Sequence, residues 1–160
     1  MEFRILGPVE VLEEDRILPL GGPKPRALLV HLLLGAGRAV SRDELMEELW
    51  GDHPPPSARD SLNVHAGVLR RALGSRLRTV PSGYLVEAVP EEVDSARFEA
   101  EVAGARRRAP DPAQRSGQLA AALSLWRGPA YGGIPVGPSA AAAAARLEEL
   151  RLDALEDRVE

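Results

Sequence analysis

Apolar positions recur with a helical period in the segment 57–86, and their spacing predicts a helix followed by a β-hairpin. Ser57 followed by Asp60 is typical of a helix start, so we expect Ser57 to cap this helix. The apolar residues after this start are spaced four, three and four residues apart, at Leu62, Ala66, Leu69 and Leu73. This spacing places them on one side of a helix, where they form a buried stripe. The residues from there to Val86 predict a short turn and a hairpin, which we call the wing.

The opposite side of this predicted helix, at about 100° per residue, carries short polar, methyl-bearing and cationic groups. They are Asn63, Val64, Gly67, Val68 and Arg71, with Arg70 near the edge. Between Ser61 and Val86 the chain has four arginines, at positions 70, 71, 76 and 78, and no acidic residue. Such a helix, followed by a hairpin with two arginines, suits a DNA groove flanked by phosphates. An ordinary amphipathic helix with a solvated face accounts for this stretch equally well, and both interpretations stay open here.

The residues before this helix predict a small sheet and two further helices. Three short apolar runs, at 3–6, 9–12 and 17–20, predict three antiparallel strands. The segment 24–35 predicts a buried helix, since it is rich in Leu and Ala and its proline is confined to the first turn. Ser41 with Glu44 forms a capping box that opens the next helix. We expect that helix to bury Leu45 and Leu49, together with Met46 and Trp50.

After Pro90 the pattern predicts helices only. Helical spacing of apolar residues predicts a helix over 94–109, with Phe98, Val102 and Ala105, and another over 113–126, with Leu119, Leu123 and Trp126. The segment 128–138 predicts a loosely ordered loop, and Ser139 is expected to cap a long alanine-rich helix that runs to the chain end. That helix has an apolar face with Leu147, Leu150, Ala154 and Val159 and no later segment to cover it. We therefore expect a piece of a longer helical domain.

Composition narrows the class of protein. The chain has 160 residues, 44% hydrophobic and 28% charged, which is typical of a soluble globular protein of one or two domains. Twenty basic against 24 acidic residues give a net charge of −4, so DNA binding must depend on a local patch. The lack of cysteine excludes disulfides, thiolate catalysis and cysteine-ligated metals. With no long apolar run and no leader, we expect a cytoplasmic protein without a membrane partner.

Residue clusters for catalysis or metal binding are not evident in the sequence. The three histidines, His31, His53 and His65, are too far apart for a helical metal pair, and we expect His31 to be a hydrogen-bonded core residue. The segment 21–24 lacks the spacing of a phosphate-binding loop and predicts a turn. The arginines at 106–108 are expected to compensate a helix dipole on a solvated face. No triad signature is present, so we expect neither an enzyme nor a metal or cofactor.

The order of these elements resembles the Streptomyces antibiotic regulatory protein family. The resemblance is carried by FRILGPVEV, LGGPKPRALLVHLLL, GRAVSRDELMEELWG, LNVHAGVLRRALG, TVPSGYLV, VDSARFE, ALSLWRG and ARLEELRLDALEDRVE, which together cover nearly all of the chain. It implies an α+β fold in which an OmpR-type winged helix-turn-helix domain with an N-terminal β-sheet occupies residues 1–90. It further implies that residues 94–160 are all-α, tetratricopeptide-like helices that form the first, incomplete part of a bacterial transcriptional activator domain.

The resemblance also implies a function and partners. Such a protein is a sequence-specific transcriptional activator of an antibiotic biosynthetic gene cluster. It binds direct repeats of double-stranded promoter DNA near the −35 element and contacts the sigma-factor region of RNA polymerase, and a homodimer on DNA is one option. The alternative is a protein-interaction module whose winged helix has little affinity for DNA.

At the matching positions the resemblance assigns DNA contacts to individual residues. Base edges would be faced by Asn63, Val64, Gly67 and Val68, because an amide can pair with adenine and a valine can touch a thymine methyl. The phosphate contacts would come from His65, Arg70 and Arg71, from the indole N–H of Trp50, and in the wing from Arg76, Arg78 and Thr79. A core position fits Trp50 better than a DNA contact.

Two residues depart from the family's pattern. Val68 stands where family members commonly carry arginine, and Val80 lies in the wing near a position where they often carry another. Because these arginines are missing, we expect specificity to depend on Asn63, methyl contacts and DNA shape in place of bidentate guanine readout by arginine.

Overall fold

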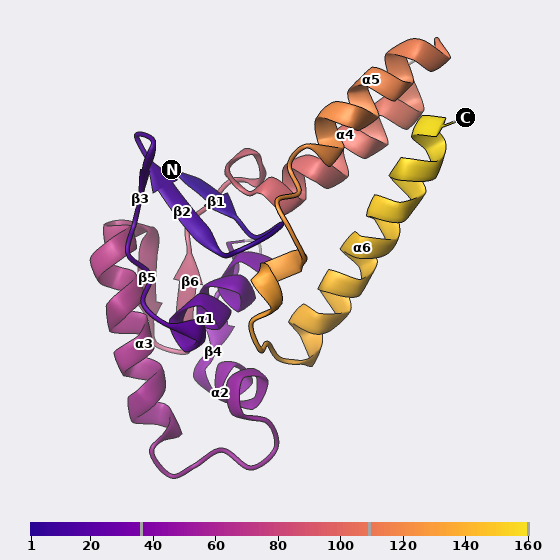
Figure 1. Ribbon diagram of the computed structural model, residues 1–160. Coiled ribbons are helices and arrows are strands. Elements are labelled where there is room, and N and C mark those ends of the chain that lie inside the picture. The colour runs from indigo at the N-terminus through magenta and orange to yellow at the C-terminus, as the bar shows by residue number, and fades with distance from the viewer. Residues whose placement is uncertain (36, 109, 160) are drawn as a thin grey trace.

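The computed structural model describes residues 1–35, 37–108 and 110–159. The N-terminal part consists of β1 (Glu2–Arg4), β2 (Glu10–Glu13), β3 (Arg16–Ile17), α1 (Pro23–Leu34), β4 (Val40–Ser41), α2 (Arg42–Trp50), α3 (Ala58–Leu73), the 3-10 turn η1 (Gly74–Arg76), β5 (Leu77–Val80) and β6 (Gly83–Val86). The C-terminal part consists of the 3-10 turn η2 (Pro90–Glu92), α4 (Asp94–Arg108), α5 (Pro112–Leu123), the 3-10 turn η3 (Ala130–Gly133) and α6 (Pro138–Val159). Figure 1 shows α4 and α5 extending away from the N-terminal part, and α6 running from beside that part to the outer end of these two helices.

Two small antiparallel sheets frame the N-terminal part. The first has the order β1-β2-β3, and Phe3 of β1 also forms an isolated parallel bridge with Val93. The second has the order β4-β6-β5, so that β6 is paired on both edges. The three predicted N-terminal strands and the wing hairpin are confirmed, whereas the pairing of β4 with the wing was not evident from the sequence.

Helix α1 lies at the centre of the N-terminal part. It contacts α2, α3, β6 and α6, and Leu28, Leu29 and Leu32 are fully buried. Helix α3 packs on α1 and α2 through the predicted stripe, whose four residues are all buried: Leu62, Ala66, Leu69 and Leu73. The apolar period of the sequence therefore identified the buried side of α3 correctly.

The two predicted helix caps have different outcomes. The Ser41 hydroxyl accepts a hydrogen bond from the Glu44 backbone N–H at 3.1 Å, which confirms the start of α2. Ser57 occupies the N-cap of α3 but makes no side-chain cap bond, so that part of the prediction is wrong. Its φ of −85° and ψ of 1° depart from the extended backbone that an N-cap hydroxyl needs. The Ser57 carbonyl instead accepts from the Ser61 N–H at 2.9 Å.

The helical part is built on contacts among α4, α5 and α6. Its core contains Phe98, Val102, Ala105, Leu119, Ala122, Trp126, Leu147 and Ala154. The rings of Phe98 and Trp126 meet edge to face, with their centroids 5.6 Å apart. Trp126 was expected inside a helix, but α5 ends at Leu123, so Trp126 lies in the segment that follows and its indole is buried against the helical core.

The loop after α5 and the start of α6 differ from the sequence expectations. Tyr131 is buried, its N–H donates to the Ile5 carbonyl at 2.8 Å, and its hydroxyl donates to the Ala140 carbonyl at 3.0 Å, so this loop is tied down. Helix α6 begins at Pro138, so Ser139 lies within its first turn and does not cap it. The Ser139 N–H is 3.3 Å from the Glu48 carboxylate, which supplies the acceptor from another helix.

The apolar face of α6 is partly covered. Leu147 and Ala154 are buried against the other helices, so the expectation that this face is uncovered is wrong for them. Leu152, Leu155 and Val159 are exposed by 59%, 40% and 87%. The helix pair α4–α5 and, near the start of the helix, the N-terminal part cover one side of α6, whereas Leu152, Leu155 and Val159 face solvent.

Side chains exchanged between the two parts hold them together. Leu6, from the N-terminal part, lies in the helical core, while Tyr131 and Ala140 lie in the N-terminal core. The buried Asp94 carboxylate accepts from the N–H groups of Ile5 at 2.8 Å and Leu6 at 3.0 Å. Burial raises the pKa of Asp94, and these hydrogen bonds oppose that rise.

His31 forms a second link between the parts. Its imidazole is buried, and Nε2 accepts a hydrogen bond from the Gly137 N–H at 3.1 Å at the start of α6. A Cβ on Gly137 would lie 2.5 Å from the Glu48 carbonyl oxygen, so only glycine allows this close approach to α2. The expectation that His31 is a hydrogen-bonded core residue is confirmed. Burial lowers the pKa of His31, because the charged form is poorly solvated there.

We expect Asp94→Asn to lower the free energy of unfolding by about 1–3 kcal/mol, because an amide has one acceptor oxygen for two buried N–H groups. Urea unfolding followed by circular dichroism measures this change. Asp111→Asn is the matched control, since Asp111 is exposed and makes no side-chain cap bond. Equal stability of the two variants would show that Asp94 does not hold the junction.

We expect stability to fall as the pH drops below about 6.5, partly because of His31. Its pKa is lower in the folded protein, so the unfolded chain binds the proton first and is favoured on acidification. The contribution of neutral His31 to stability is complete above its pKa in the unfolded chain. It is lost as the pH falls toward its pKa in the folded protein. In His31→Gln, the slope of unfolding free energy against pH should become shallower by up to about 1.4 kcal/mol per pH unit. An unchanged slope in urea titrations would contradict this.

Candidate nucleic-acid interface

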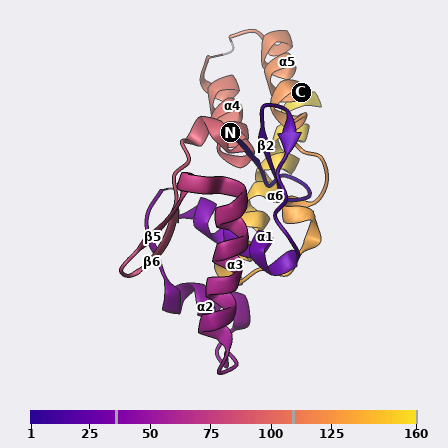
Figure 2. The same cartoon turned by 90° about the vertical axis from the view of Figure 1, so that its left-hand side faces the viewer.

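Helix α3 packs on α1 and α2 with one side, and its opposite long side lies at the protein surface. Figure 2 shows this helix at the front of the N-terminal part, with the β5–β6 wing beside it. We call Asn63, Val64, Gly67, Arg70 and Arg71 the outer face of α3. All are exposed except Gly67, which is half-buried, and Val64 is 63% exposed. The structure thus places these predicted site residues together on one accessible surface.

Val68, the remaining predicted base contact, lies at one edge of this surface and is half-buried. A Cβ added at Gly21 would be 3.1 Å from the Val68 Cγ1 atom. Gly21 has a φ of +78°, a conformation that glycine adopts without strain. Val68 therefore packs beside the turn that precedes α1, and only part of its side chain is accessible.

Asn63 lies at the opposite edge and is linked to the wing. The Tyr84 hydroxyl of β6 donates a hydrogen bond to the Asn63 Oδ1 atom at 2.6 Å. Tyr84 is only 4% exposed, and the Arg42 guanidinium lies over its ring, 5.0 Å from the centroid. The sequence analysis did not assign Tyr84 to the site, although it is the only aromatic residue in the hairpin sequence.

Arg70 is also linked to the wing. Its Nη2 group donates to the Thr79 hydroxyl of β5, and both residues are exposed. This contact holds the guanidinium over the junction of α3 and the wing. Arg71, one residue further along, is exposed on the outer face of α3.

Trp50, His65 and Lys24 meet where α2, α3 and α1 come together. The Trp50 and His65 rings are stacked, with their centroids 6.3 Å apart and their planes 23° apart. The Lys24 ammonium lies 4.9 Å from the Trp50 ring centroid and donates to the Leu49 carbonyl. Burial, followed by the nearby Lys24 charge, lowers the pKa of His65. Trp50 is half-buried, as expected for a residue with a packing role, and the sequence analysis missed Lys24.

The two remaining wing arginines are paired with acidic residues that follow the hairpin. Arg76 donates through two nitrogens to the Glu92 carboxylate, at 2.8 and 2.9 Å, and also to the Glu87 carbonyl. These hydrogen bonds lower the pKa of Glu92 to about 2. Arg78 forms an exposed ion pair with Glu87 at 2.9 Å. The stretch without acidic residues, 61–86, thus ends just before Glu87 and Glu92, which partly neutralise Arg78 and Arg76.

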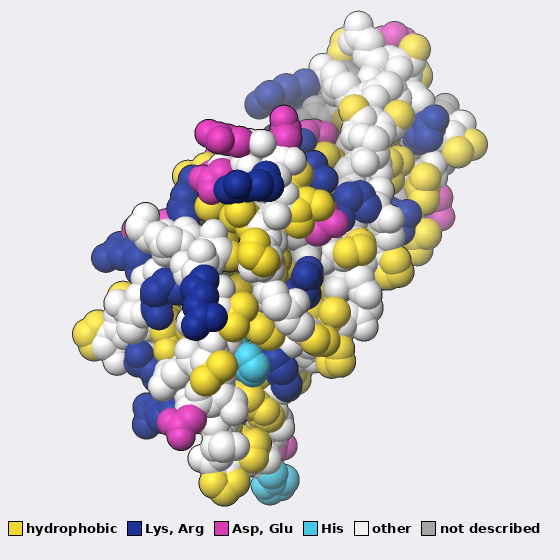
Figure 3. Space-filling view, turned by 60° about the vertical axis from the view of Figure 1, so that its left-hand side comes forward, with side chains coloured by type: hydrophobic (Ala, Val, Ile, Leu, Met, Phe, Trp, Pro, Cys, Tyr) yellow, Lys and Arg dark blue, Asp and Glu magenta, His cyan; other side chains and the backbone are white. Residues whose placement is uncertain are grey.

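Charge is distributed unevenly on this side of the molecule. Figure 3 shows Lys and Arg side chains along the middle of the face, whereas most Asp and Glu side chains gather above it, at the height of the N-terminal sheet. The β2–β3 turn there contains the exposed Glu13, Glu14 and Asp15. The result is a local cationic surface on a protein of net charge −4.

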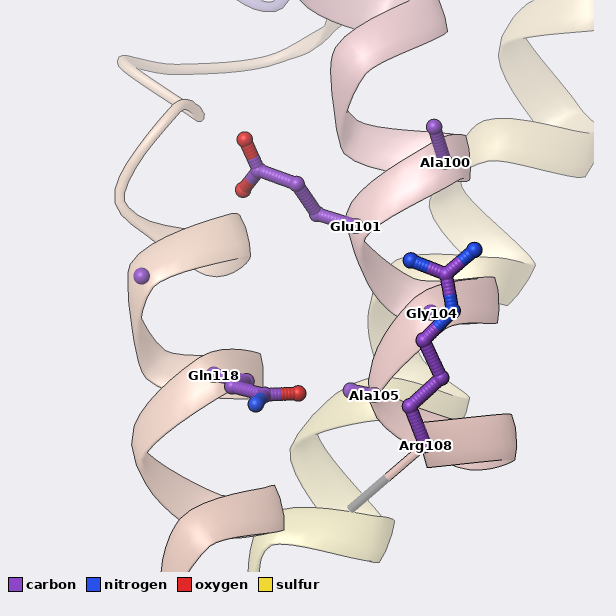
Figure 4. Close-up of a pocket in the computed structure, with 7 residues that line it drawn as sticks. Ala100, Glu101, Gly104, Ala105, Arg108 and Gln118 are labelled. Carbon is purple, nitrogen blue, oxygen red and sulfur yellow. The ribbon is translucent and has the colours of Figure 1, made fainter.

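A separate groove lies in the helical part. It has a volume of about 470 Å³ and is lined by Ala100, Glu101, Gly104, Ala105, Arg108, Gln118 and Ala121 of α4 and α5. Figure 4 shows Glu101 and Gln118 pointing into the space between the two helices. Across residues 1–35, 37–108 and 110–159, no three His, Cys, Asp or Glu side chains are grouped as a metal site. In the same ranges, no helix combines the length and apolar character needed to cross a membrane.

Comparison with known proteins identifies both parts. Residues 20–88 match the family described as "Transcriptional regulatory protein, C terminal", and residues 93–160 match the "Bacterial transcriptional activator domain". The chain is 39% identical over 169 residues to the transcriptional regulator RedD of Streptomyces coelicolor, covering 99% of this chain and 48% of RedD. It is 35% identical to the regulatory protein DnrI of Streptomyces peucetius, covering 100% of this chain and 64% of DnrI.

A solved structure agrees with this assignment. Mycobacterium tuberculosis EmbR, in complex with a low-affinity phosphopeptide, superposes with a TM-score of 0.86 at 32% identity, covering 98% of this chain and 44% of EmbR. The fold and the two domain matches thus define a winged-helix domain followed by a bacterial transcriptional activator domain. The chain belongs to the Streptomyces antibiotic regulatory protein family. It spans about half the length of RedD.

We expect Arg76→Ala to lower the free energy of unfolding by about 1 kcal/mol, because it removes a bidentate ion pair at the base of the wing. The salt dependence of DNA binding should stay unchanged, since this guanidinium is already occupied by Glu92. Urea unfolding and binding titrations at several salt concentrations measure the two effects. A salt slope reduced by about one would instead support the phosphate contact predicted from the sequence.

Proposed function

We propose that this chain is the DNA-binding and activating portion of a transcriptional activator that places α3 in the major groove of promoter DNA. The observation that carries the proposal is the outer face of α3, which is accessible along its length and lies between the wing and the turn before α1. A major groove admits a single α-helix in this way. The cationic groups near the face supply the attraction to phosphates.

Base contacts are assigned to the middle of the outer face. Val64 offers exposed methyl groups that can touch a thymine methyl, and the Asn63 amide can hydrogen-bond a base edge. Gly67 lets the helix backbone approach the bases closely. Val68 contributes less, because part of its surface is covered near Gly21.

Phosphate contacts are assigned to the groups at the margins. Arg70 and Arg71 are exposed, and Thr79 orients Arg70 toward the wing side. Lys24 lies on the other side, beside Trp50 and His65. The lowered pKa keeps His65 largely neutral at pH 7, so it would approach a phosphate as an N–H donor rather than as a cation. Arg78 is exposed and can exchange Glu87 for a phosphate.

The relatives extend this proposal to the biological role. RedD and AfsR of Streptomyces coelicolor are described as a transcriptional regulator and a regulatory protein, respectively. We propose that this chain activates an antibiotic biosynthetic gene cluster in the cytoplasm, binds direct repeats near a promoter and contacts the sigma-factor region of RNA polymerase. A homodimer on DNA is compatible with two adjacent repeats.

A second candidate function is a protein-interaction module with little DNA affinity. The ion pairs of Arg76 and Arg78 favour it, because they reduce the charge that the wing offers to DNA. A gel-shift titration against a genomic promoter fragment separates the two functions. An activator should bind specifically and lose affinity steeply as salt rises, whereas an interaction module should show weak binding without sequence preference.

We expect Arg70→Ala and Arg71→Ala to weaken binding to cognate and random DNA equally, because phosphate contacts carry no sequence information. Asn63→Ala should relax the preference at one base position, at a cost of about 1–3 kcal/mol for the cognate site. Arg107→Ala, at an exposed position of the distant α4, is the matched control. Fluorescence anisotropy measures all four affinities. An unchanged sequence preference in Asn63→Ala would remove this residue from base readout.

A further inference from the structure

The hydrogen bond between Tyr84 and Asn63 bears on which base the outer face of α3 selects, provided that the proposed DNA-binding function holds. An asparagine amide has an acceptor at Oδ1 and two donors at Nδ2. A free amide can pair with adenine, which presents the N7 acceptor beside the N6 amino donor. In this protein Oδ1 already accepts from the Tyr84 hydroxyl at 2.6 Å.

The position of the Tyr84 hydroxyl is fixed by its surroundings. β6 is paired on both edges, where Tyr84 lies opposite Val40 of β4 and Thr79 of β5. The Arg42 guanidinium covers the ring, and an Arg42 nitrogen donates to the Pro81 carbonyl at 3.1 Å. A Cβ on Gly83 would lie 1.9 Å from the Val40 carbonyl oxygen, so glycine allows β4 to approach this strand. The tyrosine is therefore held by the sheet and not by Asn63.

Turning the Asn63 amide away from Tyr84 would have a cost. The Tyr84 side chain is almost completely buried, and its hydroxyl would lose its acceptor. The Oδ1 atom therefore stays directed at the wing, and the exposed residue offers its Nδ2 donors to the groove. Guanine presents two acceptors, O6 and N7, on its major-groove edge and no donor. Adenine would have to direct its N6 amino group at the remaining lone pair of an oxygen that is already held toward the wing, which disfavours the bidentate pairing.

We propose that Tyr84 is a specificity-determining residue, which makes Asn63 present its Nδ2 donors to the groove and so select guanine over adenine. This reverses the adenine pairing expected from the asparagine alone. Tyr84 acts through Asn63 and is a positioning residue. Through this contact the Asn63 amide would recognise guanine in a chain that has Val68 where family members commonly carry arginine.

Selection from a random DNA pool with the full 160-residue chain tests the proposal. The position that loses its preference in Asn63→Ala is the one read by this amide. There the wild-type protein should enrich guanine. Tyr84→Phe frees Oδ1 and should shift the guanine-to-adenine affinity ratio toward adenine by about tenfold, the order of discrimination that one bidentate contact provides. Tyr131→Phe is the matched control, because it removes the other buried tyrosine hydroxyl, which bonds to the Ala140 carbonyl far from α3.

Further outcomes separate this inference from the proposed function. Asn63→Asp keeps an acceptor for Tyr84 but removes the donors, so it should lose the guanine preference even if Tyr84→Phe does not fold. Adenine enrichment by the wild-type protein, or an identical base preference in a folded Tyr84→Phe variant, would overturn the inference while leaving DNA binding intact. No specific binding by the wild-type protein would overturn the proposed function and the inference with it.

Discussion

The burial of α1 on all sides is the constraint on which the rest of the structure depends. This helix touches α2 and α3, the wing strand β6 and the first turns of α6. Because protein interiors are close-packed, a displacement of α1 would move the outer face of α3 and the helical part together. The exchange of Leu6 and Tyr131 between the two cores reinforces this coupling. The outer face of α3 and the helical part are therefore coupled through α1.

The candidate interface concentrates its charge in a narrow region. Glu87 and Glu92 follow the wing and engage Arg78 and Arg76, so the exposed Arg70 and Arg71 supply the positive charge on the outer face of α3. A protein with net charge −4 gains little nonspecific attraction to DNA. The proposed DNA binding would therefore depend on how α3 and the wing are placed relative to each other. Two contacts, at Asn63 and Arg70, fix that placement.

Much of the fold was predictable because it follows from local periodicity. The buried stripe of α3, the order of strands and helices and the Ser41 cap were all correct. The caps at Ser57 and Ser139 were not, because the Ser57 backbone, with a ψ of 1°, departs from the extended N-cap conformation and Ser139 lies within the first turn of α6. The order in the loop around Tyr131 was missed, since its partners are the distant Ile5 and the start of α6.

By itself the sequence determined which side of α3 is buried and which residues form its outer face, because a helix has one period and apolar groups leave water together. Only the tertiary structure decided the state of those residues. Their partners come from other elements of the fold. Tyr84 orients Asn63, and Thr79 orients Arg70. Glu92 neutralises Arg76, and the turn at Gly21 covers part of Val68. Hydrogen bonds and ion pairs act over a few ångströms in space, and a linear pattern does not encode which distant groups the fold brings within that range.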